Sequence, residues 1–172
     1  MALPEVFNDP RWYGILLVAI ALIVQYQRTL SWTEFRAIHK LKVRWLPVIG
    51  QFTTLFVISH KGGRDDAEFI ATTDMSVRET FKRLVSGGGS PHVLCSIKKR
   101  PNPDGEGTQY SAAHVVWIGA EDQVEAFLFK NDDGTTDVYA HEETSVMDPT
   151  GHLTDEQTDG DSDGVVKAAL SG

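Results

Sequence analysis

The sequence predicts an α+β protein in which one N-terminal apolar helix precedes a small antiparallel sheet with a single helix packed across it. Three observations lead to this fold class. The first 30 residues contain one long apolar run. Several later segments alternate apolar and polar residues between Gly, Asn and Asp, which is typical of strands. One amphipathic stretch with helical spacing lies among them. A chain of 172 residues leaves room for one domain plus appendages.

The apolar run from Trp12 to Val24 contains no charged or strongly polar residue. Asp9 can cap a helix there, and Pro10 suits its first position. A helix continuing to Leu30 would extend about 31 Å, close to the roughly 30 Å of a bilayer's hydrocarbon core. Aromatic residues flank both ends, as in an aromatic belt. These features predict a transmembrane helix over 10–30, with a peripheral or core-docked helix as the alternative. The residues expected at the membrane interfaces are Trp12, Tyr13, Tyr26, Arg28, Trp32, Arg36, Lys40, Lys42 and Arg44.

Charge is divided unevenly along the chain. Residues 1–101 carry 14 basic and 8 acidic side chains, whereas residues 102–172 carry 2 and 16. More basic residues follow the apolar run than precede it, so the positive-inside rule places the short N-terminal tail (1–9) outside and the C-terminal domain inside. The basic segment 31–47 is expected either to meet anionic lipid or to be a solvated face. The acidic half has no cationic stripe, which argues against nucleic acid as a partner.

Local signals predict the remaining elements in order. Ser31 and Glu34 form a capping box that starts a short helix, and the alternation from Lys40 to Trp45 indicates a strand. Ser76 and Glu79 form a second capping box, which opens the helix that ends at the glycines of 86–89. Asn131–Gly134 predicts a hairpin turn. The predicted strands of this α+β domain (48–146) are Phe52–Ser59, 67–73, His92–Lys98, Gln109–Gly119, Val124–Lys130 and Thr136–His141.

Two glycine-rich stretches imitate binding loops. The sequence SGGGS at 86–90 follows a helix, where carbonyl groups are exposed, and lacks the Gly-Lys-Ser/Thr ending of a phosphate loop. The sequence DGDSDG at 159–164 has acids at the first, third and fifth positions of a calcium loop, but its twelfth position is Leu170. A linker and a solvated acidic segment are the interpretations we favour. The single cysteine, Cys95, shares a predicted strand face with Val93 and is expected to be buried and inert.

His114 and His141 are the candidate ligands, because both lie in predicted strands that could converge. Glu142 or Glu143 would then complete a metal site. The six histidines show no HxH or HxxxH spacing, and there is no nucleophile elbow or Cys/His signature. The sequence therefore predicts no catalytic residue, no metal ligand and no cofactor.

The acidic tail over 147–172 is expected to be extended or mobile, with a short docking turn at Val165–Leu170. Phrases such as KNDDGTTDVYAHEETS and DPTGHLTDEQTDGD, rich in Asp and Thr, resemble small membrane-anchored proteins of haloarchaea or their viruses. That resemblance is one of composition and points to no named family. It implies an acidic, strongly hydrated surface suited to high salt.

Two functions remain open from sequence. The first is a non-catalytic membrane-anchored protein that presents an α+β interaction domain at the inner membrane face. Such a protein would bind the lipid bilayer and another protein or itself, as a structural or assembly component of a membrane-containing (viral) particle. The alternative is a membrane-tethered hydrolase or metal-dependent enzyme that uses His114, His141 and nearby carboxylates.

Overall fold

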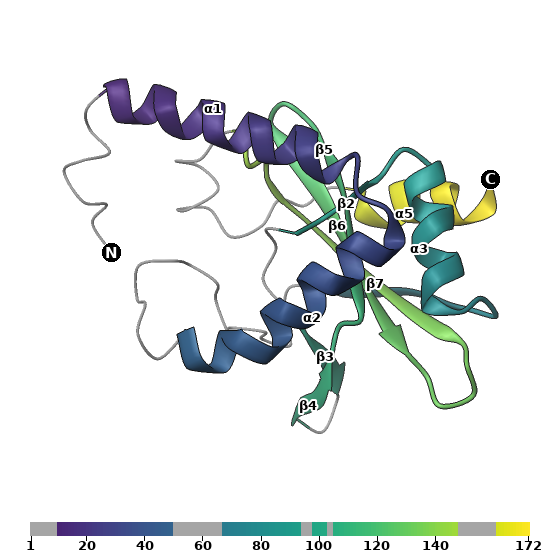
Figure 1. Cartoon of the computed structure of the whole chain (residues 1–172). Coiled ribbons are helices and arrows are strands. Elements are labelled where there is room, and N and C mark those ends of the chain that lie inside the picture. The colour runs from purple at the N-terminus through teal and green to yellow at the C-terminus, as the bar shows by residue number, and fades with distance from the viewer. Residues whose placement is uncertain (1–9, 50–66, 94–97, 103–104, 148–160) are drawn as a thin grey trace.

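The computed structural model describes residues 10–49, 67–93, 98–102, 105–147 and 161–172 (Figure 1). Its helices are α1 Pro10–Gln27, α2 Trp32–Ile49, α3 Val77–Ser86 and α5 Ser162–Ser171. Its strands are β1 Glu68–Thr73, β2 Ser90–Pro91, β3 Lys99–Asn102, β4 Gly105–Tyr110, β5 Ala113–Ile118, β6 Asp122–Lys130 and β7 Thr136–Thr144. Five strands form an antiparallel sheet in the order β1-β7-β6-β5-β2, and β3 pairs with β4 alone. The α+β class with an antiparallel sheet is thus confirmed.

The predicted transmembrane helix is wrong. None of the helices in the described part of the chain combines enough length with enough apolarity to span a lipid bilayer. The single-pass placement, with the N-terminus outside and the C-terminal domain inside, is corrected with it. α1 ends at Gln27, three residues before the expected end, and includes the polar residues Arg11 and Gln25. Its last turns pack against the rest of the chain, since the side chains of Val24 and Gln27 are buried.

α2 is longer than the sequence indicated. The capping box is confirmed, since the Ser31 amide donates to Glu34 Oε2 over 2.8 Å. The strand expected over 40–45 is wrong, because the helix runs through it to Ile49. Phe35 and His39, which are buried, are one helical turn apart, so the packed side follows the helical period instead of the alternation.

One face of the sheet packs against α3 and α5. The central strand β6 has seven consecutive buried residues, so both of its faces are covered. Val124, Ala126 and Leu128 alternate onto the apolar side, where Phe81 of α3 and Val166 of α5 join the same cluster. The start of α2 contributes to this layer, since the rings of Phe35 and Phe81 are 4.9 Å apart. α3 and α5 lie beside one another at this side of the sheet (Figure 1).

The last helix, α5, replaces the short docking turn expected at Val165–Leu170. Asp161 caps it by accepting a hydrogen bond of 2.8 Å from the Gly164 amide, so this acid of the calcium-like stretch has a structural role. Val166 and Ala169 are buried against the domain. Part of the tail predicted to be mobile is therefore packed.

The strand boundaries differ most around residues 90–112. In the segment expected to link two strands, residues 101–102 belong to β3 and residues 105–107 to β4, and the strand expected over 109–119 is divided between β4 and β5. The chain changes sheet at Ser111 and Ala112, whose amides donate to Lys98 O over 2.8 Å and to Leu128 O over 2.7 Å. β1 pairs with β7. The predicted strand Phe52–Ser59 and Cys95 lie outside the described residues.

The helix Val77–Ser86 and the hairpin between β6 and β7 match the sequence prediction. The Ser76–Glu79 capping box is complete, with Ser76 as the cap. β6 and β7 are joined by a turn in which Gly134 has φ of +91°, a conformation that favours glycine.

A substitution at Gly87 tests the contact between α3 and α5. A Cβ built on this glycine would lie 2.5 Å from Cβ of Ala169. We expect Gly87→Ala to lower the free energy of unfolding by about 1–3 kcal/mol through overpacking. The control is Gly14→Ala on α1, where an added Cβ meets nothing within 4 Å. It should raise stability by up to about 1 kcal/mol. Urea unfolding followed by circular dichroism measures both, and equal effects would contradict the prediction.

Candidate functional site

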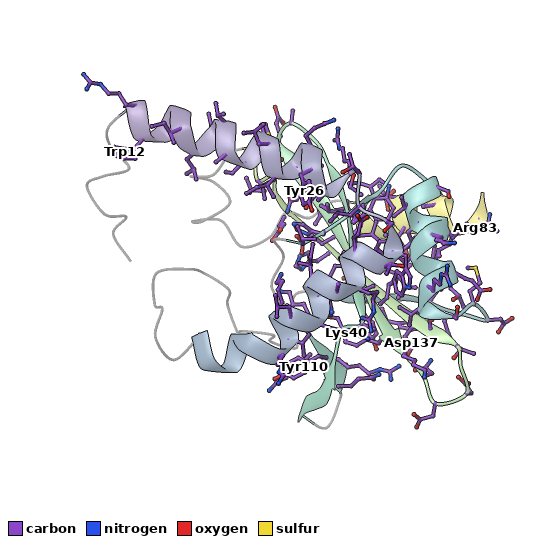
Figure 2. The ribbon with its side chains drawn as sticks, viewed as in Figure 1. Trp12, Tyr26, Lys40, Arg83, Tyr110 and Asp137 are labelled. Carbon is purple, nitrogen blue, oxygen red and sulfur yellow. The ribbon has the colours of Figure 1, made fainter. Side chains whose placement is uncertain are left out.

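α1 exposes a line of apolar side chains. Trp12, Ile15, Val18, Leu22 and Tyr26 are 52%, 58%, 61%, 66% and 58% exposed, and Ala19 beside Val18 is also exposed. Trp12, Ile15, Ala19, Leu22 and Tyr26 are three, four, three and four residues apart, which places them in one stripe at the a and d positions of a heptad, with Val18 beside it. Figure 2 shows Trp12 near the outer end of α1 and Tyr26 near the end closest to the sheet. Contiguous apolar surface of this kind marks an interaction site.

The residues predicted for membrane interfaces have different environments in the structure. Trp12, Tyr26, Arg28, Lys40 and Arg44 are exposed, and the side chain of Tyr13 lies outside what the structure describes.

The other three of these residues bind protein groups. Trp32 packs on Phe81 with 4.9 Å between ring centroids. Arg36 donates to the carbonyl oxygen of Ala112, and Lys42 donates to the carbonyl oxygen of Val93 over 2.6 Å. Through these two hydrogen bonds, α2 contacts the residue that precedes β5 and a residue that follows β2.

The second face of the sheet carries a buried polar layer. Glu125, on β6, lies directly opposite His141 of β7 in the strand register. The Glu125 side chain is only 4% exposed, and its Oε1 is 2.7 Å from Nδ1 of His92. Its Oε2 is 3.5 Å from Nε2 of His141. Burial alone raises the pKa of Glu125, but the adjacent His92 and His141 hold it well below its ordinary value. The layer therefore contains a buried negative charge.

Gln123 orients both carboxylates of this layer. Its amide nitrogen donates to Oε1 of Glu143 over 2.6 Å and to Oε1 of Glu125 over 3.3 Å. Its carbonyl oxygen accepts from the Val146 amide over 3.0 Å, which fixes the direction of the side-chain amide. The Oε2 of Glu143 lies 3.7 Å from Nε2 of His141. Glu125, His141 and Glu143 are the described residues that could hold a metal ion, with one ligand atom of each within 4.8 Å of the others.

The structure does not bring His114 and His141 to one site. The ring of Phe127 stands between them, with its centroid 5.1 Å from each imidazole. His114 is fully buried and its Nε2 contacts the hydroxyl of Ser111. Glu142 alternates onto the opposite face of the sheet, opposite Val124. Of the sequence candidates, only His141 and Glu143 come together.

Sequence reasoning missed Glu125, Gln123 and His92. An alternating strand with a single Glu is typical of a solvated face, whereas in the structure Glu125 is buried beside His92 and His141. One signal was present: His141 and Glu143 are two residues apart, a spacing that puts both on one face of a strand.

Comparisons with protein-family models, with curated proteins and with solved structures find no match.

His39 is the imidazole whose protonation is most clearly linked to stability. Burial, with smaller contributions from the charges of Arg36 and Lys42, lowers its pKa from 6.5 to about 4. It contacts His114, with 5.4 Å between ring centroids, and burial likewise lowers the pKa of His114. The unfolded chain binds protons at these groups between pH 6.5 and 4, whereas the folded chain does not. Stability is therefore lost as pH falls through that range.

We expect His39→Leu to flatten this pH dependence. A shift from 6.5 to about 4 corresponds to about 3 kcal/mol of stability lost on full acidification, by the free energy of a pKa unit. Thermal unfolding should show a smaller drop in Tm between pH 7.5 and 4.5 in the variant than in the wild type. A parallel change in Tm for both proteins would contradict the assignment.

Proposed function

We propose that the protein is a non-catalytic assembly component that pairs with a second copy of itself through the apolar stripe of α1. The observation that carries this proposal is the exposed heptad line Trp12–Ile15–Ala19–Leu22–Tyr26. Coiled-coil pairing uses residues at these spacings, and each apolar side chain inserts between residues of the facing helix.

The pattern of side-chain sizes favours an antiparallel pair centred on Ala19. Reading outward from Ala19, each direction meets one branched aliphatic residue, Ile15 or Leu22, and then one aromatic residue, Trp12 or Tyr26. In an antiparallel pair the small residue meets its own copy at the crossing, and Trp12 meets the partner's Tyr26. Such an interface uses the same patch on both subunits, as a two-fold dimer requires. Opposed helix dipoles add a favourable term.

The placement of α1 also supports pairing. Its outer end extends away from the sheet (Figure 1), and the helical period places the stripe on the side away from the buried Val24 and Gln27. A second helix can therefore approach without displacing the contacts of α1 with its own domain.

Leu22→Glu should separate the dimer. A carboxylate in the seam would be buried without a partner, so we expect the dimer dissociation constant to rise at least tenfold. The control is Ala21→Glu, at an exposed position outside the stripe of the same helix. Sedimentation equilibrium of the full chain gives both constants. Two results would contradict the proposal: a wild-type protein that remains monomeric at the highest protein concentration measured, or equal effects of the two variants on the dissociation constant.

Cysteine crosslinking tests the direction of the pair. In a Cys95→Ser background, Ala19→Cys should form an intersubunit disulfide on mild oxidation, because the two copies meet at that position. Trp12→Cys should not, since its antiparallel neighbour is the partner's Tyr26. Strong crosslinking through both positions would indicate a parallel pair and overturn the antiparallel arrangement. Non-reducing gel electrophoresis distinguishes these outcomes.

A further inference from the structure

We infer that the buried polar layer on the second face of the sheet is a binding site for a divalent transition-metal ion of the zinc class. The ion would be held by Glu125, His141 and Glu143. This goes beyond the assembly function, because it concerns a different face of the molecule. One nitrogen and two carboxylate oxygens converge there from the neighbouring strands β6 and β7.

The separations of these atoms match metal ligation better than hydrogen bonding. His141 Nε2 lies 3.5 Å from Oε2 of Glu125 and 3.7 Å from Oε2 of Glu143. Both distances exceed the 2.7–3.2 Å expected of an N–H···O hydrogen bond. Zinc ligands bound at about 2.1 Å in a tetrahedron are roughly 3.4 Å from one another. The two separations from His141 Nε2 are therefore already close to those of bound ligands, and one ligand atom of each residue lies within 4.8 Å of the others.

The hydrogen bonding of His141 points the same way. Its side chain is 5% exposed, its Nδ1 has no hydrogen-bond partner, and its Nε2 faces the two carboxylates only at ion-pair distances of 3.5 and 3.7 Å. A buried polar atom without a partner is costly and rare in native proteins. A cation bound at Nε2 would satisfy that atom and compensate the two carboxylates that face it.

The surrounding residues orient the ligands as an outer shell does. Gln123 holds the Oε1 atoms of both Glu125 and Glu143, which leaves each Oε2 directed at His141. His92 contacts the same Oε1 of Glu125 over 2.7 Å. Metal-binding carboxylates are commonly held in this way by a second set of side chains.

The ligand set indicates which ions should bind. An imidazole nitrogen among the ligands suits Zn²⁺ and other late transition metals, whereas Ca²⁺ takes six to eight oxygen ligands. Three protein ligands leave a fourth position for water. The Glu143 side chain is 19% exposed and so lies at the solvent side of the site.

Zinc titration of the full chain by calorimetry tests the site, with Glu143→Gln as the variant. The wild type should bind one equivalent of Zn²⁺, its Tm should rise with zinc, and millimolar Ca²⁺ should not compete. Glu143→Gln should raise the zinc dissociation constant at least tenfold. Glu142→Gln is the matched control, because it removes the adjacent carboxylate from the opposite face of the same strand. It should change the constant less than twofold.

His141→Gln provides a second variant and should also weaken zinc binding at least tenfold. Circular dichroism verifies that each variant is folded, and Glu143→Gln, at the partly exposed ligand, keeps the test valid if His141→Gln unfolds. Three results would overturn the inference: no saturable zinc binding by the wild type, equal effects of Glu143→Gln and Glu142→Gln, or displacement of zinc by calcium. The last two would indicate adventitious binding by surface carboxylates.

Discussion

The buried charge of Glu125 is the constraint on which the arrangement of the sheet depends. Glu125 occupies the middle of the central strand, where both faces are covered. Side chains alternate along a strand, so a slip of one residue would carry this carboxylate into the apolar layer beside Leu84 and Val166. Leaving a carboxylate there without a partner would cost several kcal/mol. In the observed register it meets His92, His141 and Gln123, and the alignment of β5, β6 and β7 follows from that requirement.

α2 contributes to both the apolar and the polar layer. Its first turns carry Phe35 to the apolar side, where the ring packs against Phe81, and its next turn carries His39 to His114 on the polar side. The cations Arg36 and Lys42 end on backbone carbonyls of the sheet region. Two basic residues that the sequence suggested would contact lipid thus bind α2 to the residues next to β5 and β2. Long side chains serve this role well because their apolar stems are buried while their charged ends find acceptors.

Features set by neighbouring residues could be predicted from sequence, and features set by distant ones could not. The capping boxes at Ser31 and Ser76 and the turn at Gly134 each depend on a few adjacent residues, and all three are present. The continuation of α2 through 40–45 was missed because it depends on contacts with Ala112 and Val93, far along the chain. The polar layer was recognised only in part: His141 and Glu143 share a strand, whereas Glu125 and His92 join them through pairing that a single sequence does not reveal.

One side of α1 contacts its own domain, and the other side carries the exposed apolar stripe. Among its described side chains, those that are buried, Val24 and Gln27, both belong to the last turns. Gln27 Oε1 accepts from the Val93 amide over 3.4 Å, so this end of the helix is tied to the sheet region. Most of the stability of a helix in a protein comes from the packing of its apolar face and not from helix propensity. The exposed turns from Trp12 to Leu22 have few such contacts, and the self-pairing that we propose would cover them.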